Sequence, residues 1–592
     1  MTRLFSVSSP WERIRGFFEN PENLLFVALL VAHVAPVWLF PFFPSHDGPA
    51  HLNTAVILRE YSRSPLLQEH YVFVAGPASA WLAHLVMAVL MSAVSPLIAE
   101  KIFVTGCVIL LPLAMRYALS AIHSGAKFLA CLVFPFATGW FLHQGFYSFA
   151  MSLPVFCLVL GYWIRHQDRM ATTKAVMLSG WLLLLWLAHI VSLIMAAVAI
   201  AGLTTCRWVD LLGRPASASG TVAAFRQFRH DVVRVFLAFL PSLALLVIYL
   251  MPGLDRLPPL APAMLIVPAT LLVLGGIACL WLGALRLLVH RLAPIGRRAL
   301  LVTAVLMFLT AAVVPTVTPS GMSAGRRWMT LICLNAVASY DDREQVAAIA
   351  LAALFAGMTL YQIRRRLAGL SSPAPSAFLP LAGVFAFMTL VSPDGMAGGG
   401  FVVVRLSAFP YLILLLWFGL SQWSRTGKLV VQGCAAAIAL TLVGYHIRQY
   451  QDLNPILQEY LSGRHLVAPG ATLVSYSTRD AIRDRLVGSS SLAPERGRID
   501  VARSTAGYIG ALGNVVFLTN YHLRSRGFPF RLRAQSNREV DYVLLWKVPA
   551  GVMTRGGPHG VFEQFPARYE LIFTSPRWGY MKLYRRKGLA PQ

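Results

Sequence analysis

One acidic residue stands out by the residues that frame it. Asp47 lies in the segment Pro44-Ser-His-Asp-Gly-Pro-Ala-His51, directly after the first long apolar run, with His46 before it and His51 after it. The Gly-Pro pair that follows Asp47 suits a turn into a helix with proline at its first position. A helix N-terminus and a nearby cation both favour an ionised carboxylate, the form that a general base needs. Asp47 is therefore the candidate catalytic residue, with His46 and His51 as candidate substrate-binding residues.

A simpler interpretation of the same segment stays open. Asp47 would then only cap the helix, and the two histidines would be solvated loop residues. Its position favours chemistry, because most other external loops that the sequence predicts are short. Residues 52–61 are amphipathic, which predicts a helix lying along the membrane surface.

Polar residues at the edge of apolar runs are further candidates for substrate binding, because they are costly to place in lipid. Arg405 follows a glycine-rich segment at the outward start of a predicted span, where a guanidinium can hold a lipid-linked phosphate with two parallel hydrogen bonds. His189, in a long apolar run, is a possible donor to a phosphate or a sugar hydroxyl. His143 and Arg326, in predicted external loops, complete the set. For each of these residues a packing or solvated role is the alternative.

The elements that position these residues follow from composition. The chain has 592 residues, of which 57% are hydrophobic and 13% charged, so the bilayer must be the solvent for much of it. Helices are the only open structures that satisfy their own backbone there. The apolar N-terminal run predicts an uncleaved first span. Single spans are predicted near residues 23–43, 102–118, 129–143, 146–164, 233–251, 263–289, 299–316, 345–362, 376–391, 407–422 and 429–446.

Two apolar runs need a separate interpretation. Residues 174–203 are too long for one span and have arginines on both sides, which predicts two half-length helices that form a V with His189 near the outward apex. Counting residues 78–94 as a span would invert every later loop, so they predict a juxtamembrane or re-entrant helix, although a crossing by residues 78–97 stays open. The total becomes about thirteen spans, with the N-terminus cytoplasmic and the C-terminus outside.

The chain divides into a transmembrane part and a soluble part. Residues 1–447 form the membrane domain, with a first external loop at 44–101, and residues 448–592 form a small α/β domain. This second part carries 21 Lys and Arg against 10 Asp and Glu, which suits a position over anionic headgroups. Its polar and aromatic elements 503–508, 520–521 and 528–530 are either glycan contacts or plain surface loops. Strands are predicted at 471–476, 514–519, 540–546, 569–573 and 580–584, and helices at 454–461 and 479–486.

Several function classes are excluded by pattern. The net charge of +26 comes mainly from short arginine-rich loops between apolar runs, as the positive-inside rule expects, and no nucleic-acid-reading motif accompanies it. The seven cysteines include no CxxC pair, so neither a zinc site nor a disulfide framework is predicted. Motifs for ATP hydrolysis, serine hydrolysis or dinucleotide binding are absent in a suitable context. We expect no cofactor.

The layout resembles that of a known superfamily. A carboxylate in the first external loop, a following amphipathic helix, a broken helix pair and an external α/β domain together resemble the GT-C integral-membrane glycosyltransferases, in the arrangement of protein mannosyltransferases and aminoarabinose transferases. The resemblance implies a polyprenyl-phosphate-sugar donor and gives Asp47 the role of the acid that activates the acceptor. His46-Asp47 stands where many relatives have two acids, which argues against bound magnesium. In the loop 143–149, only Gln144 and Ser148 stand where relatives often have another polar or acidic residue, so no second acid is predicted.

These observations predict a membrane all-α protein with a C-terminal periplasmic α/β domain. Its expected function is transfer of a sugar from a polyprenyl-phosphate carrier to a lipid or cell-envelope glycan, at the periplasmic face of the bacterial inner membrane and with inversion. Arg405 and His189 would hold the phosphate leaving group. A non-catalytic scaffold of envelope-glycan assembly and a transporter are the alternatives, although a transporter would need broken helices in two repeated halves and one pair is visible.

Overall fold

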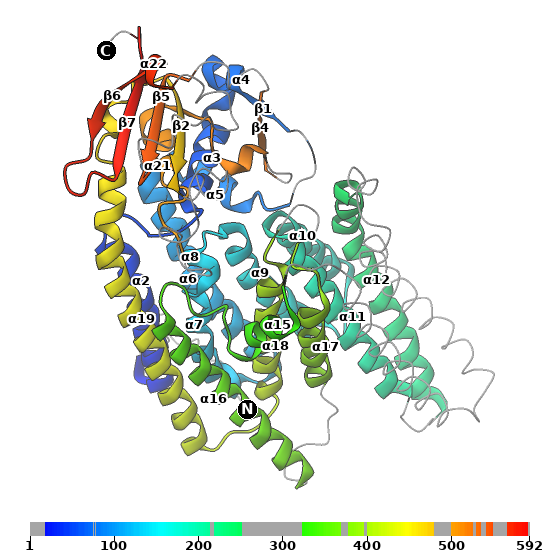
Figure 1. Cartoon of the computed structure of the whole chain (residues 1–592). Coiled ribbons are helices and arrows are strands. Elements are labelled where there is room, and N and C mark those ends of the chain that lie inside the picture. The colour runs from blue at the N-terminus through cyan, green and yellow to red at the C-terminus, as the bar shows by residue number, and fades with distance from the viewer. Residues whose placement is uncertain are drawn as a thin grey trace, which may run out of the picture.

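A bundle of helices carries a small sheet at one end in the computed structural model (Figure 1). The predicted spans at 263–289 and 299–316 and the predicted helix at 479–486 lie outside the described residues. The structure describes residues 18–74, 76, 79–212, 218–250, 322–368, 377–395, 400–478, 499–524, 528–533, 540–548 and 565–589.

Within this described part, nine helical segments are long and apolar enough to cross a membrane, and two shorter apolar helices accompany them. The chain is therefore a multi-pass membrane protein. The long segments are α2 (Pro21–Leu39), α6 (Pro96–Ile122), the interrupted segment Ser124–His143, α9 (Tyr147–His166), α11 (Ile190–Leu212), α12 (Ala218–Leu250), α16 (Asp342–Leu367), α18 (Val402–Gly419) and α19 (Arg425–Tyr460); the shorter ones are α10 (Thr172–Ala188) and α17 (Phe378–Val391).

Local sequence signals set where these helices begin. The Asn20 side chain accepts a hydrogen bond of 2.9 Å from the backbone N–H of Glu22, and a proline follows at the first turn of α2. A proline also stands in the first turn of α6, after Ser95, whose side chain makes no capping hydrogen bond. The Ser424 hydroxyl caps α19. The helix starts are thus encoded locally, independently of the membrane.

The span predicted at 129–143 is interrupted. A 3-10 helix, η2 (Ser124–Val133), is followed by two short α-helical turns, α7 (Phe134–Ala137) and α8 (Trp140–His143). The chain breaks at Gly139, where a Cβ would lie 2.5 Å from a backbone carbonyl oxygen of a distant segment. Close approach of that second segment therefore prevents one continuous helix.

The predicted break at His189 is confirmed. His189 has an extended backbone, with φ −168° and ψ 130°, between α10 and α11. The half-length prediction is wrong, since α10 has 17 residues and α11 has 23, which correspond to about 26 and 35 Å at the α-helical rise. The apolar run in the sequence ends at residue 203, but α11 continues through the polar residues that follow, up to Leu212.

The helix after Asp47 is buried and does not lie on a membrane surface. α3 (Gly48–Glu60) packs against α5 (Leu82–Leu90) and α21 (Ala506–Gly513), and its first two turns are completely buried. The predicted surface position is wrong because the polar side chains of Asn53 and Thr54 hydrogen-bond to the C-terminal region instead of to water. With nine residues, about 14 Å, α5 is too short to cross a bilayer, which agrees with the juxtamembrane prediction.

The C-terminal region contains a five-stranded mixed sheet of order β3-β2-β5-β7-β6. β2 is parallel to β3 and β5, and β7 is antiparallel to β5 and β6. Every strand that the sequence predicted is present, within a few residues. The predicted helix at 454–461 forms the last turns of α19, which continues without a break from its apolar part to the sheet (Figure 1). The strands are β2 (Thr472–Ser477), β3 (Val516–Phe517), β5 (Tyr542–Trp546), β6 (Tyr569–Thr574) and β7 (Met581–Arg586).

The first loop and the C-terminal region are built together. β1 (Tyr71–Phe73) pairs antiparallel with β4 (Phe530–Leu532), and the phenol of Tyr71 donates to the carbonyl of Phe517 at 3.2 Å. The Asn454 side chain accepts from the backbone N–H of Phe42 at 3.0 Å and donates to its carbonyl at 3.2 Å. Contacts between segments more than 400 residues apart thus place both regions at one end of the bundle, which we call the sheet end (Figure 1).

The close packing of α21 on α3 gives a testable prediction. A Cβ on Gly507 would lie 2.4 Å from the carbonyl oxygen of Pro49, so Gly507→Ala forces two helices apart. We expect a loss of about 1–3 kcal/mol, seen as a lower midpoint of thermal unfolding of the detergent-purified protein. Gly180 of α10 has open space around it, so Gly180→Ala should raise or preserve that midpoint. Equal midpoints for the two variants would contradict this packing.

Candidate functional site

The backbone around Asp47 is held by the turn between α8 and α9. The N–H of His46 donates to the carbonyl of His143 at 2.9 Å, and the N–H of Asp47 donates to the carbonyl of Gln144 at 3.2 Å. Gly145 follows with φ +79°, and a Cβ there would lie 2.7 Å from the Asp47 nitrogen. Only glycine suits that backbone and that distance. The predicted external turn at 143–146 therefore fixes the position of Asp47 through main-chain contacts.

The Asp47 side chain does not cap the helix. Asp47 directly precedes α3, but its carboxylate makes no capping hydrogen bond to the helix backbone, so the interpretation as a mere cap is wrong. The hydroxyl of Ser504 donates to its Oδ1 at 3.2 Å, and the phenol of Tyr521 donates to the same carboxylate. Both donors come from the C-terminal region. Asp47 is 7% exposed, so its carboxylate lies within the interface of the two regions.

This environment tunes the acidity of Asp47. Burial raises its pKa from an ordinary value of 3.8 to about 7. Hydrogen bonds from Tyr521 and Ser504 and the charges of Arg503 and Arg405 act in the opposite direction and offset part of the rise. Burial and the negative charge of Asp47 hold the pKa of Tyr521 well above its usual range, so its hydroxyl remains a donor. A carboxyl that titrates near neutrality can exchange protons at physiological pH.

His46 is also part of this site, as predicted. Its Nε2 lies 3.8 Å from Oδ1 of Asp47, close enough for an ionic contact when the ring is protonated. Both side chains are largely buried, with 13% and 10% of their areas exposed. The His-Asp pair of the sequence is therefore also a pair of neighbouring side chains.

Arg405 lies within electrostatic range of Asp47 and of Tyr521. It is the fourth residue of α18, which begins at Val402, five residues before the predicted start of this span. Its guanidinium carbon lies 4.3 Å from the ring centre of Phe146 and 5.7 Å from that of Phe149, a cation–π arrangement. Its Nε is buried and has no hydrogen-bond partner among the described residues. This cation therefore retains a donor for an anionic ligand.

His189 extends the same group of residues. Its ring meets Phe149 edge to face at 5.1 Å between centroids and lies within electrostatic range of Arg405. Its Nδ1 accepts from the backbone N–H of Val191 at 3.2 Å. Asp47, Arg405 and His189 thus follow one another in space, with Phe149 packed between the last two.

Three other predicted residues lie apart from the Asp47 carboxylate. His143 is completely buried, with Nδ1 bonded to the Ser339 hydroxyl at 2.9 Å and Nε2 to the Tyr450 hydroxyl at 2.7 Å. Arg326 is exposed on α15 (Ala324–Ile332), and no contact of the described residues joins it to Asp47. His51 packs against His84 at 3.0 Å between ring nitrogens. The structure brings together Asp47, His46, Arg405 and His189 from the predicted set.

A second acid near Asp47 was missed by the sequence analysis. Glu100, 1% exposed, accepts from the hydroxyls of Tyr147 at 2.6 Å and Tyr508 at 2.8 Å. Its Oε1 lies 2.8 Å from where a Cβ on Gly48 would be, so it supports the turn that carries Asp47. The sequence does contain a signal for Glu100, because an acidic residue in the first turns of an apolar helix is costly in lipid and therefore a candidate functional residue.

The partners of Asp47 in the C-terminal region were not predicted as such. The sequence analysis interpreted their elements as glycan contacts or plain surface loops, and packing against the first loop contradicts the surface-loop alternative for Arg503, Ser504 and Tyr521. α21 and η6 (Tyr521–Arg524) pack on α3, which buries these segments against the first loop. More than 450 residues separate them from Asp47, and local sequence carries no signal for such a contact.

Comparison with solved structures finds a likeness to ArnT from Cupriavidus metallidurans, whose crystal structure was determined with undecaprenyl phosphate bound. The match covers 96% of this chain and 99% of the ArnT chain, with 10% sequence identity and a TM-score of 0.42. No protein-family model and no curated protein matches the sequence.

The tuning of Asp47 by its neighbours is testable without a substrate. Ser504→Ala removes a donor that favours the ionised carboxylate, so the pKa of Asp47 should rise further above 7. The measurement is a pH titration of the infrared band of the protonated carboxyl, identified as the band lost in Asp47→Asn. Ser462 lies just after α19, and its hydroxyl donates to the nearby carbonyl of Glu459, so the control Ser462→Ala should leave the band unchanged. A lower midpoint in Ser504→Ala would contradict the assigned hydrogen bond.

Proposed function

We propose that this protein is a glycosyltransferase that moves a sugar from a polyprenyl-phosphate carrier to a hydroxyl of a lipid or cell-envelope glycan. The observation that carries the proposal is a buried carboxylate with a pKa of about 7, placed beside two guanidinium groups at one end of a membrane bundle. The reaction takes place at the periplasmic face of the bacterial inner membrane. The N-terminus is then cytoplasmic, and the domain from residue 448 lies in the periplasm.

Asp47 acts as the general base. It takes the proton of the acceptor hydroxyl while the acceptor oxygen bonds to the anomeric carbon of the sugar. The bond between that carbon and the phosphate oxygen breaks at the same time, and the polyprenyl phosphate leaves with both bonding electrons. Attack opposite the phosphate inverts the anomeric centre. A base is most effective when its pKa lies near the working pH, as it does here.

The cations beside Asp47 stabilise the leaving phosphate. Arg405, with its free Nε donor, and Arg503 both act electrostatically on Asp47, so an anion bound between them lies close to the base. Guanidinium groups bind phosphate with two parallel hydrogen bonds and stabilise the charge that develops on its oxygen. His189 lies beyond Arg405 and serves as a further donor to the phosphate or the sugar.

The surrounding elements fit a donor that has a lipid tail. Arg405 stands in the first turn of an apolar helix, so a phosphate held there lies at the depth of the lipid headgroups. The tail extends into the hydrocarbon between helices. The region from residue 448, with 21 basic against 10 acidic residues, then lies over anionic headgroups and presents the acceptor.

Replacement of the base tests the proposed function. Asp47→Asn keeps the shape of the side chain but cannot accept the proton, and we expect transfer to fall about 100- to 10,000-fold. Mass spectrometry of cells that depend on the variant should show loss of one sugar from an envelope glycan and accumulation of a polyprenyl-phosphate-linked sugar.

Asp452, exposed on α19, provides the matched control Asp452→Asn, which should behave as wild type. An unchanged glycan profile in Asp47→Asn cells, at normal protein level, would refute the enzymatic proposal and favour a non-catalytic scaffold.

The pH dependence of transfer tests the role of Asp47 separately. The base works only when ionised, so activity should fall tenfold per pH unit below a midpoint near 7. Tyr521→Phe removes a donor to the carboxylate, which raises its pKa, and the acid limb should move to higher pH. The donor lipid that accumulates in Asp47→Asn cells supplies the substrate for this assay with purified enzyme. An acid limb that stays in place in Tyr521→Phe would show that another group controls it.

A further inference from the structure

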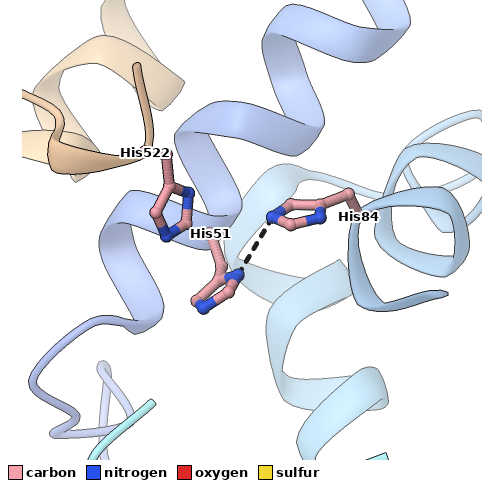
Figure 2. Close-up of side chains that lie close together, drawn as sticks. All are labelled: His51, His84 and His522. Atoms are coloured by element: carbon pink, nitrogen blue, oxygen red, sulfur yellow. Dashed lines mark hydrogen bonds between the residues drawn. The ribbon is translucent and has the colours of Figure 1, made fainter. Parts of the chain in front are cut away.

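Three buried histidines from distant parts of the chain meet beside α3 at the sheet end (Figure 2). His51 comes from α3, His84 from α5 and His522 from η6, and their exposed fractions are 5%, 0% and 0%. One ring nitrogen from each lies within 4.8 Å of the other two. Figure 2 shows the ring of His51 between those of His84 and His522, joined to His84 by a hydrogen bond of 3.0 Å. Such a set of nitrogen atoms has the composition of a metal site.

The hydrogen bonds of His522 determine where its lone pair lies. The hydroxyl of Thr54 donates its only proton to the carbonyl of Ala50 at 2.9 Å. It must therefore accept from Nδ1 of His522, which lies 2.9 Å away, so that Nδ1 carries the ring proton. Nε2 of His522 is then a bare acceptor, buried and without a hydrogen-bond partner among the described residues. A buried lone pair without a partner is costly, and a cation satisfies it.

The surroundings of the cluster suit a metal ion. All three rings are buried where α3 and α5 meet the C-terminal region. Phe528 stacks on His522 at 3.7 Å between centroids, an apolar cover for the cluster. The bond from His522 Nδ1 to Thr54 is the kind of outer contact that orients a metal-bound histidine.

We propose that His51, His84 and His522 bind one divalent transition-metal ion of the zinc class, which fastens α3 and α5 to the C-terminal region. Three imidazoles without a carboxylate or thiolate suit zinc and its neighbours and are poor ligands for magnesium or calcium. Zinc–nitrogen bonds of about 2.0–2.1 Å place the nitrogens of a tetrahedral site roughly 3.4 Å apart, a small adjustment from the observed cluster. A water molecule takes the fourth position.

The ion has a positioning role for the neighbouring site. His51 follows Asp47 by one helical turn, and its backbone N–H donates to the Asp47 carbonyl at 3.1 Å. Fixing His51 to a residue of the C-terminal region therefore fixes the turn that carries Asp47. The metal does not contact the reacting atoms, so its presence is independent of whether the proposed transfer reaction is correct.

Metal content tests the proposal directly. The full-length protein, purified in detergent through a tag without histidine, should contain about one zinc per chain by plasma mass spectrometry. His84→Gln and His522→Gln should each retain less than about a tenth of that amount. His33→Gln is the matched control, because His33 is equally buried but lies in α2 away from the cluster, and it should keep the full content. Metal retained in the cluster variants, or a wild type that stays metal-free after zinc is supplied, would overturn the proposal.

A second measurement uses only the wild-type chain, in case the variants fail to fold. After removal of metal with a chelator, added zinc should raise the midpoint of thermal unfolding and added magnesium should not. Cobalt should replace zinc and give the visible absorption of a tetrahedral nitrogen site. Absence of the zinc effect, or an equal effect of magnesium, would refute a specific site. Neither readout requires glycosyl transfer, so failure of the metal proposal is distinguishable from failure of the proposed function.

Discussion

The structure depends on one carboxylate held out of water between two regions that are far apart in the sequence. Removing an ionisable group from water is costly unless hydrogen bonds and opposite charges compensate. For Asp47 these come from Ser504, Tyr521 and Arg503 of the C-terminal region and from Arg405 of α18. Burial raises the pKa of Asp47 to about 7, and these contacts offset part of the rise. Packing of the C-terminal region on the first loop therefore sets the environment of this carboxyl.

The interface that buries Asp47 is fixed at several points around it. β1 pairs with β4 on one side, and the amide of Asn520 donates to the Ala50 carbonyl and to Asn53, both at 3.1 Å, on α3 itself. Gly507 and Gly510 allow α21 to approach α3 at distances that any side chain would prevent. A carboxylate in a flexible loop would turn toward water and lose its shifted pKa. The close packing of α3 thus keeps the Asp47 carboxyl in its buried environment.

The sequence was informative wherever the physical signal is local. Apolar length predicted the spans in the described part, alternating patterns predicted the strands, and the glycine–proline frame singled out Asp47. The break at His189 followed from arginines on both sides of one apolar run. The position of α3 was predicted wrongly because periodicity shows that a helix has a polar face but does not show that Asn520 and His522, rather than water, will meet it.

The remainder of the site was not predictable from the sequence for the same reason. Arg503, Ser504 and Tyr521 are ordinary loop residues until tertiary contacts bring them to Asp47. The cluster of His51, His84 and His522 comes from three distant parts of the chain, and no sequence-spacing motif for metal ligands predicts it. Glu100 is different, because an acid at the start of an apolar helix is recognisable from the sequence alone.

Two of the buried acids at the sheet end, Asp47 and Glu100, differ in the groups that surround them. Both oxygens of Glu100 accept from phenols, those of Tyr147 and Tyr508, so this carboxyl is already fully engaged in holding helices together. Asp47 instead faces Arg405 and Arg503, whose charges a departing phosphate would need. A base and cations must lie within a few ångströms of each other for a transfer in which a hydroxyl loses a proton as a phosphate gains charge. Of these two carboxyls, Asp47 lies within electrostatic range of both cations, as the proposed transfer requires, and Glu100 supports the turn that carries it.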